Sequence, residues 1–377
     1  MKISRITKPL CLIMAVLIFS SALSVNICAE INNGAVEEIF PDDVIVPAKT
    51  LRSDTNIVDC PDGIYTYKEM KADIKELQKN YSDIMQYKVI GVTADKRNIY
   101  DIIIGDPDAD KQIVVQAGCH GREYMTSLLA MEQVEYYLNG YYSKKYKGVS
   151  FRKLFSQYAI HIIPMLNPDG VTISQLGVKG INNKTLRNNL NTIYHNDVVR
   201  NYTKYKKDKD RYFQRWKANA KGVDINRNFD GKWKSIEALE GASALNYKGK
   251  APESEVESKS ITKLISSLSD PITVISYHAS GSVLWWDYGQ TGEFRKRCEK
   301  QMNVVSKLTG YKLQPYEKNS AGGLCDWIIE DMNGAVIPEL IEIGEGETPL
   351  DYSEFKDIWK RNKLLIPALT YLYYDEE

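Results

Sequence analysis

The chain has 377 residues, 49 basic and 49 acidic side chains, a formal net charge of zero and 43% hydrophobic residues. This length is enough for one large domain or two small ones. The balanced charge argues against a nucleic-acid or membrane-surface partner, so we expect neither.

The first 29 residues have the layout of a secretory signal peptide. Lys2, Arg5 and Lys8 form a basic start, the apolar run 10–19 follows, and small or polar residues come next. This run is shorter than the ~20 residues that a membrane-spanning helix needs, so we expect secretion and no membrane span. Removing residues 1–29 takes away three basic and no acidic residues, which changes the formal charge to −3.

The remaining chain is expected to hold a short connecting segment and one domain. Residues 30–60 carry Pro41 and Pro47 without regular periodicity, and we interpret them as a spacer or short pro-segment. Residues 61–377 form the expected domain. The four cysteines that remain after residue 29 are too few and too scattered for a disulfide framework; they are Cys60, Cys119, Cys298 and Cys325.

Helical and strand patterns alternate from about residue 65 to the C-terminus. Apolar residues at helical spacing predict a helix over 67–81, and further helices are predicted over 126–141 and 354–374. Apolar runs predict strands over 87–93, 99–105, 111–117, 158–166, 272–279 and 335–343. The alternation predicts an α/β fold, a single domain with a central mixed, largely parallel sheet flanked by helices.

A long polar segment interrupts this pattern. Residues 180–221 are basic and rich in Asn and Tyr. A segment of this length in a compact domain lines a functional cleft or forms a solvated surface loop, and the sequence leaves both interpretations open.

Residues able to bind a metal follow the predicted strands. His120 and Glu123 come after the strand 111–117 with a spacing of three, and His278 and Glu339 lie near the ends of two later strands. The carboxyl ends of strands are where sites form in open α/β sheets. Catalytic zinc commonly takes three ligands from His and Asp or Glu and keeps one position open. These residues therefore predict a zinc site with a carboxylate nearby.

Five short motifs, in this order, resemble the zinc metallocarboxypeptidases, the family of pancreatic carboxypeptidase A. They are HGRE at 120–123, NPDG at 167–170, GVDINRNFD at 222–230, SYHASG at 276–281 and IPELIEIG at 337–344. The resemblance runs from about Tyr65 to the C-terminus. HGREYMT and WKANAKGVDINRNF are most similar to the bacterial secreted branch, which includes γ-D-glutamyl-diamino-acid endopeptidases that cut peptidoglycan stem peptides.

The resemblance implies a role for each matching residue. His120, Glu123 and His278 resemble the ligands of one Zn²⁺ per chain, and Glu339 resembles the general base. Asp224 resembles the carboxylate that orients the first histidine ligand. The substrate-binding residues that it implies are Arg122, Asn226, Arg227, Tyr316 and Lys217.

Two of these residues depart from the pattern of the digestive enzymes. Lys217 stands where an arginine stabilises the oxyanion, and Arg215 is the alternative if the loop is shifted. Lysine supplies charge but no forked contact. Tyr316 stands for the tyrosine that closes over the substrate, with two extra residues before the glycines that follow.

The sequence thus predicts a secreted, monomeric zinc metallopeptidase that acts on a peptide substrate. Cell-wall stem peptides, cut at the γ-D-glutamyl-diamino acid bond, are the first substrate class. The alternatives are a general metallocarboxypeptidase that removes C-terminal residues, and a non-catalytic protein that binds the cell wall or a glycan.

Overall fold

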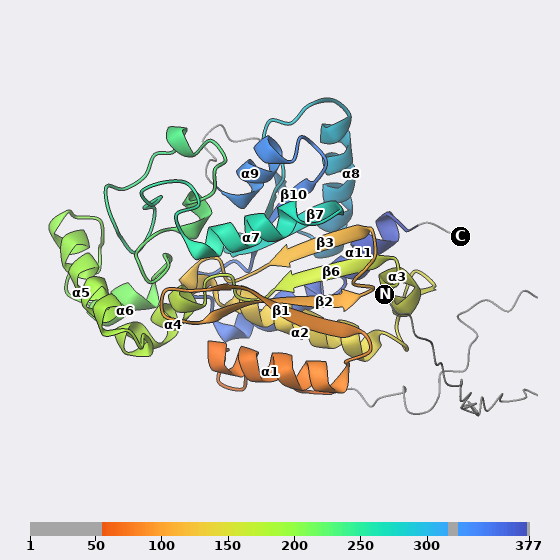
Figure 1. The fold of residues 1–377 in the computed structure, drawn as a ribbon, viewed down its shortest axis with the longest axis horizontal. Helices are drawn as coiled ribbons and strands as arrows, with labels where there is room; N and C mark the ends of the chain where they lie inside the picture. The colour runs from red at the N-terminus through yellow and green to blue at the C-terminus, as the bar shows by residue number, and fades with distance from the viewer. Residues whose placement is uncertain (1–54, 316–322, 375–377) are drawn as a thin grey trace, which may run out of the picture. The chain divides into compact units, whose positions relative to one another are not determined.

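An eight-stranded mixed sheet forms the centre of the computed structural model (Figure 1). The structure describes residues 55–315 and 323–374, so the predicted signal peptide, most of the predicted spacer and Tyr316 lie outside the described residues. The strand order is β1-β2-β6-β3-β7-β10-β8-β9. The four central strands, β6, β3, β7 and β10, are parallel to one another, which confirms the predicted largely parallel centre, and the outer neighbours β2 and β8 pair with them antiparallel.

The strands of this sheet are β1 Met85–Val92, β2 Asn98–Gly105, β3 Lys111–Gln116, β6 Tyr158–Ile163, β7 Asp270–Ala279, β8 Val283–Trp285, β9 Lys312–Gln314 and β10 Ile337–Ile343. A separate antiparallel pair consists of β4 Lys145–Tyr146 and β5 Val149–Ser150.

The helices are α1 Tyr67–Asn80, α2 Met125–Gly140, α3 Phe151–Phe155, α4 Pro168–Leu176, α5 Lys184–Val199, α6 Lys209–Gln214, α7 Val256–Ser266, α8 Gly292–Thr309, α9 Leu324–Asp331, α10 Phe355–Asn362 and α11 Leu365–Leu372. Short 3₁₀ segments are η2 Gly121–Glu123, η3 Gly177–Gly180, η4 Ile225–Arg227, η5 Trp233–Ser235 and η6 Tyr352–Glu354. Among the described residues, no helix is long and apolar enough to cross a bilayer.

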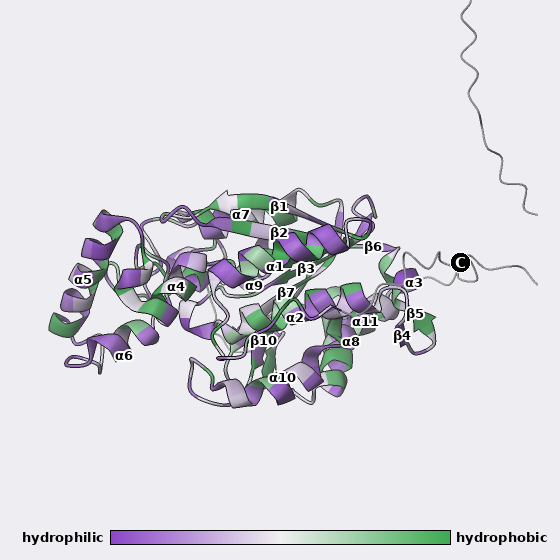
Figure 2. Cartoon of the chain, turned by 90° about the horizontal axis from the view of Figure 1, so that it is seen from below, coloured by the Kyte–Doolittle hydropathy of each residue, from purple (hydrophilic) through white to green (hydrophobic). Residues whose placement is uncertain are grey.

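The sheet separates two hydrophobic cores, because successive strand residues point to opposite faces. In β3, Ile113 and Val115 belong to the first core and Val114 to the second. The first core also contains side chains of α1, α2, α3, α8, α10 and α11, and the second contains those of α7 and α9. Figure 2 shows the central strands as mostly hydrophobic, as expected for strands covered on both faces.

Residues 55–60, the end of the predicted spacer, pack against α2. Both carboxylate oxygens of Glu135 accept backbone N–H groups, from Ile57 at 2.7 Å and from Val58 at 2.9 Å. Val58 and Cys60 are buried in the first core. Hydrogen bonds to a buried carboxylate therefore hold this end of the segment to the folded domain.

The polar segment 180–221 folds into α5 and α6 around a third core. Leu186, Leu190, Tyr212, Phe213 and Trp216 are buried in this core. These apolar residues lie within a strongly polar sequence, so their periodicity did not predict the helices α5 and α6. The parallel strands run towards the end of the sheet where α4, α5 and α6 lie (Figure 1), so the segment adjoins the carboxyl ends of the strands.

Candidate active site

The structure brings His120, Glu123 and His278 together in one buried cluster. Each residue offers a ligand atom, and these atoms lie within 4.8 Å of one another. His120 and Glu123 belong to the turn and η2 that follow β3, and His278 is the last residue but one of β7. The two strands are parallel neighbours, so their carboxyl ends place the three side chains side by side.

The atoms of the cluster face a common point in a way that fits a metal ion. Nδ1 of His278 lies 3.0 Å from Nδ1 of His120 and 3.1 Å from Oε2 of Glu123. Nδ1 of His120 lies 3.0 Å from both carboxylate oxygens of Glu123. Two ring nitrogens and a carboxylate that converge in this way, all buried, are the donor set that zinc prefers at catalytic sites.

The other ring nitrogens are held by neighbouring polar groups. Nε2 of His120 lies 3.1 Å from Oδ1 of Asp224, and Nε2 of His278 lies 3.3 Å from Oγ of Ser276. A partner on the far nitrogen fixes the orientation of a ligand ring. Asp224 therefore lies where the sequence predicted it, and Ser276 is an additional partner that the sequence analysis missed.

The pKa of each of the two buried carboxyl groups in this network is lowered. Burial opposes the charge of Glu123, but His120 and His278 together outweigh it and lower the pKa of the carboxyl well below its usual range. For Asp224, burial is likewise outweighed by Lys217, 3.2 Å away, and by His120, so its pKa is also lowered. Carboxylates that stay charged inside the protein suit a site that holds a cation.

Glu339, the predicted general base, does not point into this cluster. It pairs with Ile275 in the register of β10 and β7, and its Oε1 accepts a hydrogen bond from Gln301 of α8. Ile337 and Ile341, on the same side of β10, belong to the first core. The side chain of Glu339 is therefore on the α8 face of the sheet, away from the metal ligands.

Glu342, three residues later, occupies the place expected for Glu339. It is the register partner of His278, and side chains of register partners project from the same face of a sheet. Its Oε2 is buried and has no hydrogen-bond partner in the described part of the chain. Burial raises the pKa of Glu342, with His278, Lys217 and Arg122 acting in the opposite direction. Both glutamates lie in the motif IPELIEIG, so the motif alone did not distinguish them.

Four of the five predicted substrate-binding residues lie in the described part of the chain, in two groups. The backbone N–H of Gly121 donates to the carbonyl of Lys217 at 3.0 Å, so Lys217 lies beside the metal-binding turn that also contains Arg122. Oδ1 of Asn226 accepts from the N–H of Leu324 at 3.2 Å, and Nη1 of Arg227 donates to the carbonyl of Asn226 at 3.0 Å. The described contacts of Arg227 leave most of its guanidinium donors available.

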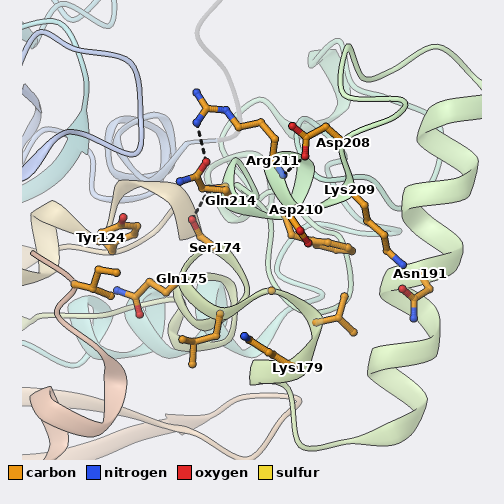
Figure 3. Close-up of a pocket in the computed structure, with 15 residues that line it drawn as sticks. Tyr124, Ser174, Gln175, Lys179, Asn191, Asp208, Lys209, Asp210, Arg211 and Gln214 are labelled. Carbon is orange, nitrogen blue, oxygen red and sulfur yellow. Dashed lines mark hydrogen bonds between the residues drawn. The ribbon is translucent and has the colours of Figure 1, made fainter. Parts of the chain in front are cut away.

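A hollow of about 760 Å³ lies beside this region, lined by Tyr124 and by residues of α4, η3 and α6. Figure 3 shows that Ser174 donates to the carbonyl of Gln214 and that Arg211 donates to Oε1 of the same residue, at 2.6 and 2.8 Å. None of the metal-binding residues lines it. The hollow therefore adjoins the site, but the metal-binding residues do not form part of its wall.

The buried position of Glu339 predicts a pH-dependent stability. Burial raises the pKa of Glu339 from 4.5 to about 7, and the hydrogen bond from Gln301 offsets only part of this rise. An unfolded chain releases the proton near pH 4.5, so the stability that this group contributes is fully present below that pH and is lost as the pH rises through about 7. Glu339→Gln removes this titrating carboxyl group, so the variant should not lose stability in this way as the pH rises. We expect the free energy of unfolding of the wild type, relative to the variant, to fall by roughly 3 kcal/mol between about pH 4 and pH 8.

Urea unfolding of both proteins over this pH range measures the difference. A difference that stays constant with pH would show that Glu339 titrates alike in the folded and unfolded chains.

The comparisons with known proteins agree with the site. The family model described as zinc carboxypeptidase matches residues 70–336. Gamma-D-glutamyl-L-diamino acid endopeptidase 1 of Lysinibacillus sphaericus is 30% identical over 314 residues, which cover 82% of this chain and 72% of that protein. Mast cell carboxypeptidase A of Homo sapiens is 24% identical over 74% of this chain and 60% of that protein.

Solved structures show the same fold. Thrombin-activatable fibrinolysis inhibitor matches with a TM-score of 0.63 and 17% identity, over 86% of this chain and 79% of that one. Carboxypeptidase A from Helicoverpa armigera matches with a TM-score of 0.57 and 17% identity, over 88% and 80%. With the family match and the buried His-Glu-His cluster, we conclude that this chain belongs to the zinc carboxypeptidase family and is a zinc metallopeptidase.

Proposed function

We propose that this metallopeptidase is secreted and cuts the γ-D-glutamyl-diamino acid bond of cell-wall stem peptides, with Glu342 as the general base. The observation that carries the chemistry is the pairing of Glu342 with His278 in the register of β10 and β7. The similarity to the Lysinibacillus sphaericus endopeptidase supports the substrate class. The signal-peptide layout of residues 1–29 supports secretion, and a cell-wall substrate lies outside the membrane.

His120, Glu123 and His278 hold the zinc in this proposal. Bound zinc supplies a Lewis acid and lowers the pKa of water toward neutrality. Glu342, whose pKa burial raises, takes the proton of the attacking water and later delivers it to the nitrogen of the leaving amine. Asp224 keeps the ring of His120 in place while these protons move.

Lys217 and Arg122 are placed to act on the negative charge that develops at the carbonyl oxygen. Both contribute a positive potential at Glu342, so both lie near the reacting bond. The amine of Lys217 is 3.2 Å from Oδ2 of Asp224, which holds its charge beside the metal ligands. A fixed cation at this place stabilises an oxyanion more than bulk water does.

A general metallocarboxypeptidase is the second candidate. The sequence pair Asn226–Arg227 and the similarity to mast cell carboxypeptidase A favour it. Defined stem peptides and ordinary peptides with free C-termini, digested in parallel and identified by mass, separate the two candidates. Cleavage between the glutamyl and diamino acid residues supports the endopeptidase, and stepwise loss of C-terminal residues from ordinary peptides supports the carboxypeptidase.

Arg227 is proposed to bind the substrate carboxylate that follows the scissile bond. Arg227→Lys keeps the charge but loses the forked contact, so we expect kcat/KM to fall roughly 10- to 150-fold. The preference of the enzyme for a free-acid substrate over its amide at this position should fall with it. Kinetics with both substrates on both proteins measure the change. If Arg227 only stabilises its loop through the carbonyl of Asn226, the substitution would lower the stability of the fold. The preference for the free-acid substrate would then stay unchanged.

A further inference from the structure

Three cations gather around Glu347, in the loop that follows β10. Oε1 of Glu347 lies 2.8 Å from Nη1 of Arg215 and 3.9 Å from Nζ of Lys204, and Oε2 lies 3.5 Å from Nη2 of Arg211. The partners differ in exposure: the side chain of Arg215 is 14% exposed, whereas that of Glu347 is 57% exposed. The least exposed member of this group is thus a guanidinium, and its carboxylate partner comes from the solvent side.

This group lies beside the metal cluster. The N–H of Gly281 donates to the carbonyl of Gly344 at 2.8 Å, and the hydroxyl of Ser280 donates to the carbonyl of Gly346 at 2.6 Å. Ser280 follows His278 by two residues, so these bonds fasten the Glu347 loop to the end of β7 that carries a metal ligand.

A cavity of about 180 Å³ adjoins this group, and its lining includes Arg122, Arg215, Lys204, Asp197 and three tyrosines, Tyr202, Tyr205 and Tyr212. Oδ2 of Asp197 accepts hydrogen bonds from the hydroxyls of Tyr212 and Ser243, at 2.6 and 2.8 Å. One guanidinium donor is unpaired there: Nε of Arg122 is buried and has no hydrogen-bond partner among the described residues. Nη1 of Arg215 has only an ion-pair contact with Glu347, at 2.8 Å, that falls short of hydrogen-bond geometry. Buried donors that lack acceptors are rare in folded proteins, so the cavity is suited to an additional acceptor.

We propose that Arg215, with Arg122 and Lys204, forms a subsite for a carboxylate on the amino side of the scissile bond, and that Glu347 occupies this subsite until substrate displaces it. The subsite rests on the proposed function, whose substrate supplies such a group. A γ-linked glutamyl residue keeps its α-carboxylate free on that side, whereas an α-linked apolar residue has none. A planar guanidinium matches a carboxylate through paired hydrogen bonds.

Displacement of Glu347 is energetically easy. Exposed ion pairs contribute little to stability, because water and salt screen them and both side chains lose freedom. The substrate carboxylate, tethered by the rest of the peptide, then satisfies the less exposed Arg215. Glu347 keeps the mostly covered guanidinium of Arg215 paired in the free enzyme.

The subsite is distinct from the place proposed for the other substrate carboxylate. Neither Asn226 nor Arg227 is among the residues that line the cavity. Asn226 instead contacts the N-terminus of α9 through Leu324. The two cationic groups can therefore be tested independently.

The test uses two stem tripeptides that differ only at the glutamyl residue, one with a free α-carboxylate and one with an α-carboxamide. We expect the wild type to cleave the carboxylate form with a kcat/KM roughly ten- to a hundredfold higher. Arg215→Gln should bring this ratio close to one. Lys296→Gln is the matched control, because it removes one positive charge from an exposed pair with Glu293 on α8 and should keep the wild-type ratio.

Glu347→Gln tests the displacement. Removing the resident carboxylate should lower KM for the carboxylate form by about two- to fivefold, in line with the small stability of exposed pairs. A higher KM would show that Glu347 organises the cations for binding and would overturn the displacement.

Calorimetry with zinc-loaded Glu342→Gln and the same two peptides separates this inference from the proposed function. Binding that prefers the carboxylate form, and that loses the preference on the added change Arg215→Gln, supports the subsite even if neither peptide is cleaved. Cleavage or binding without the preference overturns the subsite and leaves the endopeptidase intact. Failure to bind or cleave either peptide overturns both.

Discussion

Glu342→Gln is expected to lower kcat by roughly 10²- to 10⁴-fold while zinc content and fold stay unchanged. The substitution removes the group that accepts the proton of the attacking water and keeps the shape of the side chain. Its position beside His278 in the sheet register places it on the face of the metal ligands. Steady-state kinetics on a cleaved peptide, with zinc measured on the same sample, give both quantities.

Glu339→Gln is the matched control, since it is the same chemical change three residues away on the same strand. Glu339 contacts Gln301 on the α8 face, so the variant should keep more than about a tenth of the wild-type kcat. Loss of turnover in Glu339→Gln, with normal turnover in Glu342→Gln, would return the base to Glu339.

His278→Ala is expected to abolish stoichiometric zinc binding and to lower the stability of the folded chain. Zinc bound only to the folded state adds stability that grows with ligand concentration, about 4 kcal/mol at a free concentration a thousandfold above Kd. His278 supplies one of the converging ring nitrogens, and its loss leaves two ligands. Metal analysis and thermal unfolding, each with and without a chelator, measure the effect.

His161→Ala serves as the control for loss of a buried histidine. Nδ1 of His161 lies 2.8 Å from Oδ2 of Asp101, outside the metal cluster. We expect this variant to lose stability but to keep one zinc per chain and to remain sensitive to the chelator. The melting temperature of His278→Ala should instead be insensitive to the chelator. One zinc per chain in His278→Ala would mean that a different residue is the third ligand.

The sequence by itself predicted the three residues that form the buried His-Glu-His cluster and the class of fold. His120 and Glu123 follow one apolar strand and His278 ends another, and ends of parallel strands meet at one edge of a sheet. Asp224 was predicted from its motif, and in the structure its Oδ1 lies 3.1 Å from Nε2 of His120. These features depend on residue type, short spacing and strand ends, all of which a sequence displays directly.

Only the tertiary structure decided which glutamate of β10 faces the ligands. A half-buried strand shows its inward face by alternation, but β10 is covered by protein on both faces and its sequence, IPELIEI, has no regular alternation. The register with β7 assigns Glu342 to the face of His278 and Glu339 to the opposite one. The ion pair of Arg215 with Glu347 likewise joins the residue that follows α6 and the loop after β10, which come together only on folding. Long-range packing sets both, and no local pattern of residues encodes it.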